Sequence, residues 1–144
     1  MKRRFYLDSN VFISFVREEI DKAFNLRFQE SMDFFKLCNQ GKHEVVLSKL
    51  FFAEVQKITA LKKELVLEEF KRLEIEIKET GTMPDEKLAF EIVKECGIHY
   101  SDALHVAFAI GNKADFIITW NRKDFEKTGK LVKCLTPSEI SSNL

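Results

Sequence analysis

The chain has 144 residues, of which 45% are hydrophobic and 32% are charged, a balance typical of one globular domain over residues 1–144 with a substantial core. Its 23 basic and 23 acidic side chains cancel, which disfavours a general nucleic-acid clamp because such proteins usually carry excess positive charge. With five glycines and two prolines, the composition also argues against disorder and against a turn-rich all-β fold.

The N-terminal letters MKRR, followed by apolar residues, imitate a signal peptide. Asp8 and Asn10 interrupt the apolar stretch, and no cleavage site of small residues follows. No apolar run of the sequence reaches the ~18 residues that span a bilayer. We therefore expect a cytoplasmic protein that makes no contact with a membrane.

The first half of the chain predicts short apolar strands that alternate with helices. Helical spacing of apolar residues, β-branched runs and Ser48 as a helix cap support these assignments. The predicted strands cover 4–7, 44–48 and, as an edge strand, 73–79, and the predicted helices cover 11–16, 21–40, a segment after Ser48 that contains LFFAEV, and 62–72.

The second half begins with a turn over 80–84, after which Pro84 and Asp85 open a helix that runs to Cys96 and stops at Gly97. Further along, the sequence predicts a buried helix capped by Ser101 and ended by Gly111 and Asn112, a strand over 115–120, and a last helix with Thr136 as cap, Pro137 at its first position and Glu139 as capping-box partner. Helices alternating with short apolar strands indicate an α/β fold with a mostly parallel sheet covered on both faces.

Three cysteines, Cys38, Cys96 and Cys134, are odd in number and far apart. They show neither a zinc-binding spacing nor a plausible disulfide framework. We expect reduced, partly buried thiols.

Acidic side chains occur at the predicted strand ends or inside apolar helical segments. Asp8 ends the first strand, Asn121 and Asp124 follow the strand over 115–120, and Asp102 and Glu54 lie within apolar helical surroundings. In open parallel sheets, sites form outside the carboxyl ends of the strands, so these groups can converge.

Each of these residues also has an ordinary explanation when it is taken alone. Asp8 could cap a turn, Asp102 could interact with a helix dipole, and Glu54 could pair with Lys57 in solvent. Asp124 and Asn121 could be plain loop residues, and His105 is interpreted as a packing or hydrogen-bonding histidine. Together, however, ionised carboxylates in one cleft repel one another unless a cation joins them, and oxygen ligands suit Mg²⁺ or Mn²⁺ better than zinc.

Four stretches in this order resemble the PIN-domain ribonucleases, particularly the small VapC-like toxins: FYLDSNVFIS, LSKLFFAEV, GIHYSDALHVAFAI and FIITWNRKDF. The resemblance implies a three-layer α/β/α sandwich with about five strands, and hydrolysis of RNA phosphodiester bonds by water with Mg²⁺ or Mn²⁺. It makes Asp8, Glu54 and Asp102 the acidic metal ligands and catalytic residues, with Asp124 as the fourth acid.

The resemblance also suggests roles for neighbouring residues. Asn121 would be a polar neighbour of the metal centre, Thr119 would steady its loop, and Ser9 and Asn10 would support the Asp8 region. Arg122 and Lys123 could hold an RNA phosphate. Toxins of this type form homodimers and are blocked by a cognate antitoxin protein, so we expect both kinds of partner.

Two other functions remain open at this point. A non-catalytic module could keep the same fold to bind RNA or protein, which the neutral net charge allows. A phosphatase could use Asp8 as nucleophile, but the haloacid-dehalogenase type needs a second aspartate two residues later, where this chain has Asn10.

Overall fold

The computed structural model describes residues 2–18, 26–81 and 83–144 of the chain. Five strands form one sheet in the order β3-β2-β1-β4-β5, and every neighbouring pair is parallel. The strands are β1 (Arg4–Leu7), β2 (Glu44–Leu47), β3 (Glu76–Glu79), β4 (Phe116–Ile118) and β5 (Lys133–Leu135). This architecture confirms the predicted α/β sandwich with a parallel sheet.

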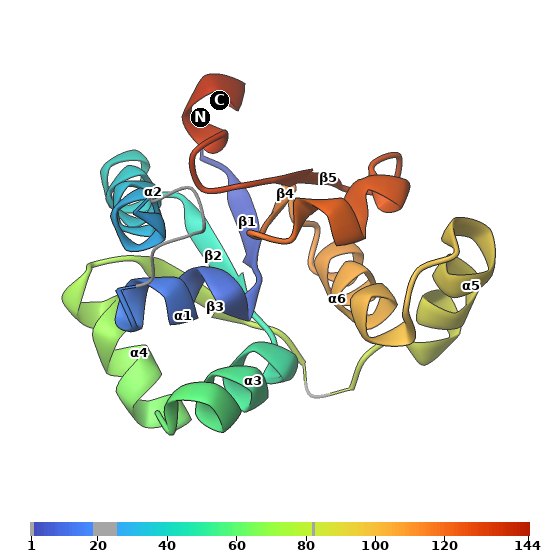
Figure 1. Ribbon diagram of the computed structural model, residues 1–144, viewed down its shortest axis with the longest axis horizontal. Coiled ribbons are helices and arrows are strands. Elements are labelled where there is room, and N and C mark those ends of the chain that lie inside the picture. The colour runs from blue at the N-terminus through green and yellow to red at the C-terminus, as the bar shows by residue number, and fades with distance from the viewer. Residues whose placement is uncertain (1, 19–25, 82) are drawn as a thin grey trace.

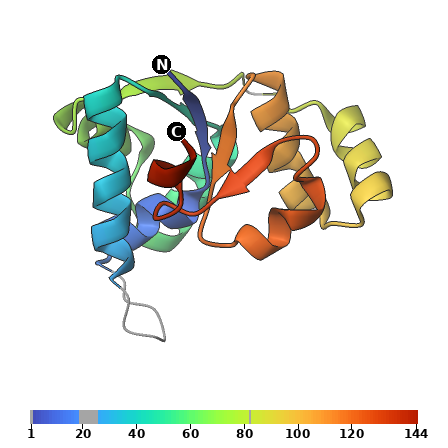
Figure 2. The same cartoon turned by 90° about the horizontal axis from the view of Figure 1, so that it is seen from above.

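Helices cover both faces of the sheet and make the three layers visible in Figure 1 and, from a perpendicular direction, in Figure 2. One face carries α1 (Ser9–Val16), α2 (Arg27–Gly41), α3 (Lys49–Thr59) and α4 (Lys63–Arg72), and the other carries α5 (Glu86–Cys96) and α6 (Tyr100–Gly111). Two short 3₁₀ helices, η1 (Arg122–Thr128) and η2 (Ile140–Asn143), flank β5 in the chain. None of the helices in the described ranges is long and apolar enough to cross a bilayer.

The alternation of side chains along each strand divides the core into two parts. In β1, Phe5 and Leu7 pack toward the α1–α4 side, whereas Tyr6 between them packs toward α5 and α6. All three are wholly buried, and burying a large apolar side chain stabilises a fold by roughly 1.5–3 kcal/mol. The phenylalanine-rich sequence forms much of the first part, where Phe12 stacks on Phe70 with ring centroids 5.2 Å apart.

The strand order creates a switch point between β1 and β4. The chain leaves β1 toward β2 and β3 on one side, then returns across the sheet through α5 and α6 to β4 on the other side of β1. Beyond the carboxyl ends of β1 and β4, the outgoing segments diverge and leave room for a site. Asp8 and Thr119 are the first residues after these two strands.

Several predicted helix boundaries shift in the structure. The first helix begins at Ser9, two residues early, and α2 begins at Arg27, while predicted residues 21–25 lie outside the described residues. Ser101 does not cap α6: His99 is the cap residue, because Ala103 N already donates to His99 O at 3.0 Å.

The predicted strand over 4–7 matches β1, whereas the other three predicted strands are longer than the observed ones. The edge strand starts at Glu76 instead of residue 73, because Glu74 adopts a left-handed φ of 56° at the end of α4. The strand predicted over 115–120 covers only β4, because the Asn10 side chain accepts the Trp120 N–H and turns the chain away from the sheet.

The C-terminal region also differs in detail. No sequence feature indicated β5 or η1. Thr136 N donates to Glu139 Oε1 at 3.0 Å, which is half of the predicted capping box, but the helix that follows is the short η2 and does not include Pro137. The three cysteines are free thiols, as predicted.

Candidate metal centre

Asp8 lies at the end of β1 and is 9% exposed, so most of its carboxylate is out of solvent. Thr119 Oγ1 donates a hydrogen bond of 2.7 Å to Asp8 Oδ2, and Ser9 Oγ makes a longer contact of 3.5 Å with Oδ1. Thr119 is itself fixed, because its hydroxyl oxygen accepts from Asn10 Nδ2 at 3.1 Å and from Asn121 N at 3.0 Å. The loops after β1 and β4 thus hold one oxygen of Asp8 in place.

Glu54 comes from α3, the helix that follows β2. Ser48 caps this helix by accepting the Phe51 N–H at 3.2 Å, which fixes the start of α3 at the carboxyl edge of the sheet. Glu54 Oε1 is buried and has no hydrogen-bond partner among the described residues. Its close neighbour is His105 Nε2 at 3.2 Å, a distance that permits an ion pair but lacks the alignment of a hydrogen bond.

Asp102 and His105 lie one turn apart in α6. This helix runs into β4, so its N-terminal turn lies at the same edge of the sheet as Asp8. Asp102 is half-buried, whereas His105 is 6% exposed and contacts Tyr6 Oη through Nδ1 at 2.6 Å. The Tyr6 hydroxyl in turn lies 2.9 Å from Ser48 Oγ, so a buried chain of polar groups joins the cap of α3 to His105.

The loop after β4 brings a fourth acid to the same place. Asn121 and Asp124 are exposed residues at the start of η1, and both line the cleft that contains Asp8. Arg122 and Lys123, however, do not line it, and Arg122 Nη1 pairs with Glu139 Oε2 at 2.6 Å. Arg122 is therefore paired with an acid outside the cleft, and its predicted contact with an RNA phosphate stays a prediction.

A cleft of about 260 Å³ unites these groups. It is lined by Asp8, Ser9, Asn10, Ile13, Glu54, Ile58, Ser101, Asp102, His105, Asn121, Asp124 and Phe125. The structure thus brings the four acids predicted from sequence into one cavity. No lysine or arginine is found among the lining residues in the described part of the chain, which leaves His105 as the basic group nearest to the acids.

Burial and mutual repulsion alter the acidity of these side chains. Burial raises the pKa of Asp8, and although His105 and Thr119 counteract it, the pKa stays above its usual range. Burial also raises the pKa of Asp102, with the charges of Asp124 and Asp8 adding to the effect. Burial alone would lower the pKa of His105, but Glu54, Asp8 and Asp102 outweigh it and raise that pKa. Burial and repulsion therefore disfavour the ionised carboxylates, and a cation in the cleft would favour them.

Three of these residues present donor atoms close enough to share one ion. One atom each from Asp8, Glu54 and His105 lies within 4.8 Å of the others. Glu54 Oε1 is buried and accepts no hydrogen bond from a described residue, although His105 Nε2 lies at ion-pair distance, so this oxygen is available as a ligand atom. Two carboxylates and an imidazole are a donor set that suits a divalent cation such as Mn²⁺.

Sequence reasoning identified the acids but missed the polar chain behind them. His105 was interpreted as a packing or hydrogen-bonding residue, and it does bond to Tyr6, but it also lies against Glu54. Two signals were present in the sequence. His105 follows Asp102 by three residues on a helix, and Tyr6 precedes Asp8 by two residues along the strand direction, so each pair is placed on one side of its element.

Comparison with known families agrees with this geometry. The family model described as "PIN domain" matches residues 5–131. A search of the curated proteins gave no match. The matched region covers the sheet except Arg4 of β1 and all of β5, and it includes every residue that lines the acidic cleft. The chain therefore belongs to the PIN domain family.

Proposed function

We propose that this protein is an endoribonuclease that hydrolyses RNA phosphodiester bonds with Mg²⁺ or Mn²⁺ in the acidic cleft. PIN domains are generally metal-dependent nucleases, and PIN nucleases act on RNA. The observation that carries the proposal is the meeting of Asp8, Glu54, Asp102 and Asp124, from four separate segments, in one cleft without lysine or arginine among its described lining residues.

The side chains of the cleft divide the work between holding a cation and shaping the site. Asp8 and Glu54 would hold the divalent cation, and Thr119 keeps Asp8 in its orientation by donating to Oδ2. Asp102 and Asp124 would add negative charge at the mouth of the cleft and place water. A divalent cation there would neutralise phosphate charge and lower the pKa of an attacking water.

RNA would have to approach an acidic cleft on a protein of zero net charge. Arg122 is paired with Glu139, so the exposed Lys123 is the neighbouring cation that we assign to the RNA backbone. Its single charge predicts weak, salt-sensitive binding of RNA. The divalent cation itself would supply much of the attraction for the scissile phosphate.

The experiment is an RNA cleavage assay with Mg²⁺ or Mn²⁺ and with chelator. Wild-type protein should cut RNA only with the cation, and Asp8→Asn and Asp102→Asn should remove the activity. Asp33→Asn, a change at an exposed acid of α2, is the matched control and should keep full activity. Cleavage at the wild-type rate by both cleft variants would reject the proposal.

We further propose that the protein is the toxin of a toxin–antitoxin pair, a homodimer held inactive by a cognate antitoxin. The resemblance of its motifs to VapC-like toxins supports this assignment. Expression of the wild-type chain should arrest growth of a host cell, expression of Asp8→Asn should not, and light scattering should give a dimer. A non-catalytic binding module instead predicts that calorimetry detects no Mn²⁺ binding to the wild type.

A further inference from the structure

We propose that His105 is itself a ligand of the divalent cation, through Nε2, and that Tyr6 and Ser48 hold its ring for that purpose. The inference rests on the proposed metal-dependent function and adds a nitrogen donor to a centre predicted to be made of carboxylates alone. It starts from one buried contact, in which His105 Nε2 lies 3.2 Å from Glu54 Oε1 without the alignment of a hydrogen bond.

Apart from this contact with each other, the two atoms have no hydrogen-bond partner among the described residues. Glu54 Oε1 is buried without a hydrogen bond to any described residue, and His105 is 6% exposed while its Nε2 makes no hydrogen bond within the described ranges. An unpaired polar atom in a protein interior costs stability. A cation shared between the carboxylate oxygen and the ring nitrogen satisfies both atoms at once.

The far side of the imidazole ring is arranged as it is in metal-binding histidines. Such a histidine donates its second ring N–H to an outer acceptor, which fixes the tautomer and the ring orientation. Here His105 Nδ1 lies 2.6 Å from Tyr6 Oη, which can accept that N–H and donate its own hydrogen to Ser48 Oγ at 2.9 Å. With the hydrogen bonds donated in this direction, Nε2 carries the lone pair, and it lies against Glu54.

The remaining geometry is consistent with a three-residue centre. The donor atoms of Asp8, Glu54 and His105 lie within 4.8 Å of one another, and they come from the end of β1, from α3 and from α6. Because imidazole suits transition metals better than Mg²⁺, a nitrogen ligand predicts that the site prefers Mn²⁺ over Mg²⁺. A ring of carboxylates alone gives no such preference for nitrogen-binding metals.

The decisive experiment is pulsed electron paramagnetic resonance of Mn²⁺ bound to full-length protein labelled with ¹⁵N only in histidine. We expect a ¹⁵N coupling to bound Mn²⁺ in the wild type. His99→Gln is the matched control, because His99 is exposed at the start of α6 near Asp102 and should leave the coupling unchanged. His105→Gln should lose the coupling. The wild-type spectrum tests whether a histidine binds the ion, and the exposed His99→Gln variant then distinguishes His105 from His99 even where His105→Gln does not fold.

Tyr6→Phe tests the outer part of the chain by calorimetry with Mn²⁺. Loss of an outer partner of a metal-binding histidine weakens metal affinity by about 10–100-fold, and we expect that decrease with the ¹⁵N coupling retained. Unchanged affinity in Tyr6→Phe would overturn the positioning role of Tyr6.

The possible failures are distinguishable. Mn²⁺ that binds the wild type without a histidine coupling, or with one that disappears in His99→Gln, would overturn the ligand role of His105 and leave the carboxylate centre intact. Absence of Mn²⁺ binding to the wild type would overturn this inference together with the proposed nuclease function.

Discussion

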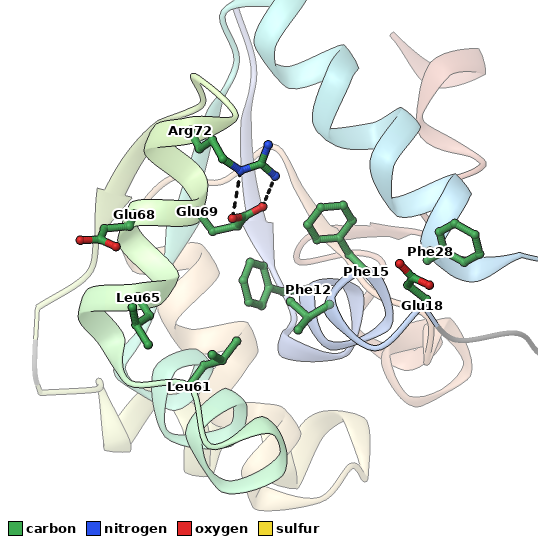
Figure 3. Close-up of a pocket in the computed structure, with 10 residues that line it drawn as sticks. Phe12, Phe15, Glu18, Phe28, Leu61, Leu65, Glu68, Glu69 and Arg72 are labelled. Atoms are coloured by element: carbon green, nitrogen blue, oxygen red, sulfur yellow. Dashed lines mark hydrogen bonds and ion pairs between the residues drawn. The ribbon is translucent and has the colours of Figure 1, made fainter.

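The acidic cleft differs sharply from a second, larger pocket between α1 and α4, shown in Figure 3. The second pocket has a volume of about 650 Å³ against about 260 Å³ for the cleft, and phenylalanine and leucine side chains dominate its lining. Three glutamates also line it, Glu18, Glu68 and Glu69, and Glu69 is paired with Arg72, as the dashed lines in Figure 3 mark. The acids of the cleft have no such arginine among the described lining residues.

One short helix separates the two regions. Ser9, Asn10 and Ile13 of α1 line the cleft, whereas Phe12 and Phe15 line the larger pocket. Positions three or four apart share one side of a helix, so eight residues are enough to give α1 a polar end and an apolar side. The comparison teaches that the convergence of acids from separate segments, without a lysine or arginine among the described lining residues, identifies the chemical site better than cavity size does.

The largest effect should come from removing a cleft acid and a pocket acid in parallel. Asp102→Asn should abolish RNA cleavage, a loss of at least about 100-fold, since even outer partners of metal ligands commonly account for 10–100-fold. Glu69→Gln in the larger pocket should leave the rate unchanged, because its charge is paired with Arg72 at a distance from the cleft residues. Initial rates of RNA cleavage with Mn²⁺ compare the two variants. Equal losses of rate would contradict the assignment of the chemistry to the cleft rather than to the larger pocket.

The reverse contrast concerns stability. Phe12 is wholly buried and stacks on Phe70, so Phe12→Ala should lower the free energy of unfolding by about 3–5 kcal/mol. Leu65 lines the same pocket but is 53% exposed, and Leu65→Ala should change stability by no more than about 0.5 kcal/mol. Urea unfolding compares the two, and a change below about 1 kcal/mol for Phe12→Ala would contradict the observed packing.

Thr119→Val tests whether the hydrogen bond from Thr119 holds the Asp8 carboxylate in its active orientation. The change keeps the shape but removes the donor to Asp8 and the acceptor for Asn10 and Asn121. We expect cleavage to fall by about 10–100-fold in folded protein. Thr59→Val removes a hydroxyl that donates within α3, and it serves as the control with an unchanged rate. An undiminished rate in Thr119→Val would show that Asp8 needs no such support.

The smallest effect concerns the amino end of the sheet, opposite the cleft. Burial and Arg3 lower the pKa of His43, whose Nδ1 accepts the Arg3 N–H at 2.8 Å. A histidine whose pKa is lowered by folding stabilises the folded state when the pH is above the pKa of the unfolded state, about 6.5. This contribution is lost as the pH falls through the pKa of the folded state. Between pH 7 and about 5, the wild type should lose more unfolding free energy than His43→Gln. Parallel pH profiles of the two proteins would contradict this.

Sequence patterns predicted the fold where local signals were strong. The apolar runs of β1 and β2, the Ser48 cap and the stop at Gly97 all act within a few residues, and each lies where it was expected. β5 has only three residues, and its first, Lys133, is exposed, so no apolar run of the sequence indicated this strand. The early end of β4 depends on the side chain of Asn10, which no local rule could indicate.

The site was predictable to the extent that strand ends collect polar side chains. Asp8 follows β1 directly and Asp124 follows β4 by a short loop, so a parallel sheet was enough to bring them together. The contact between Tyr6 and His105 joins residues 99 positions apart and depends on the crossing of α6 over the sheet. The absence of a hydrogen bond to Glu54 Oε1 from the described residues likewise depends on how α3 and α6 are positioned, which the sequence does not show.

The measurement that tests the central claim most directly is a crystal structure of the protein grown with Mn²⁺, with anomalous scattering recorded to locate the ion. The account predicts an anomalous peak in the cleft, coordinated by Asp8 and Glu54. Crystals grown at saturating Mn²⁺ whose cleft shows no peak, or whose ion lies away from these two carboxylates, would contradict it.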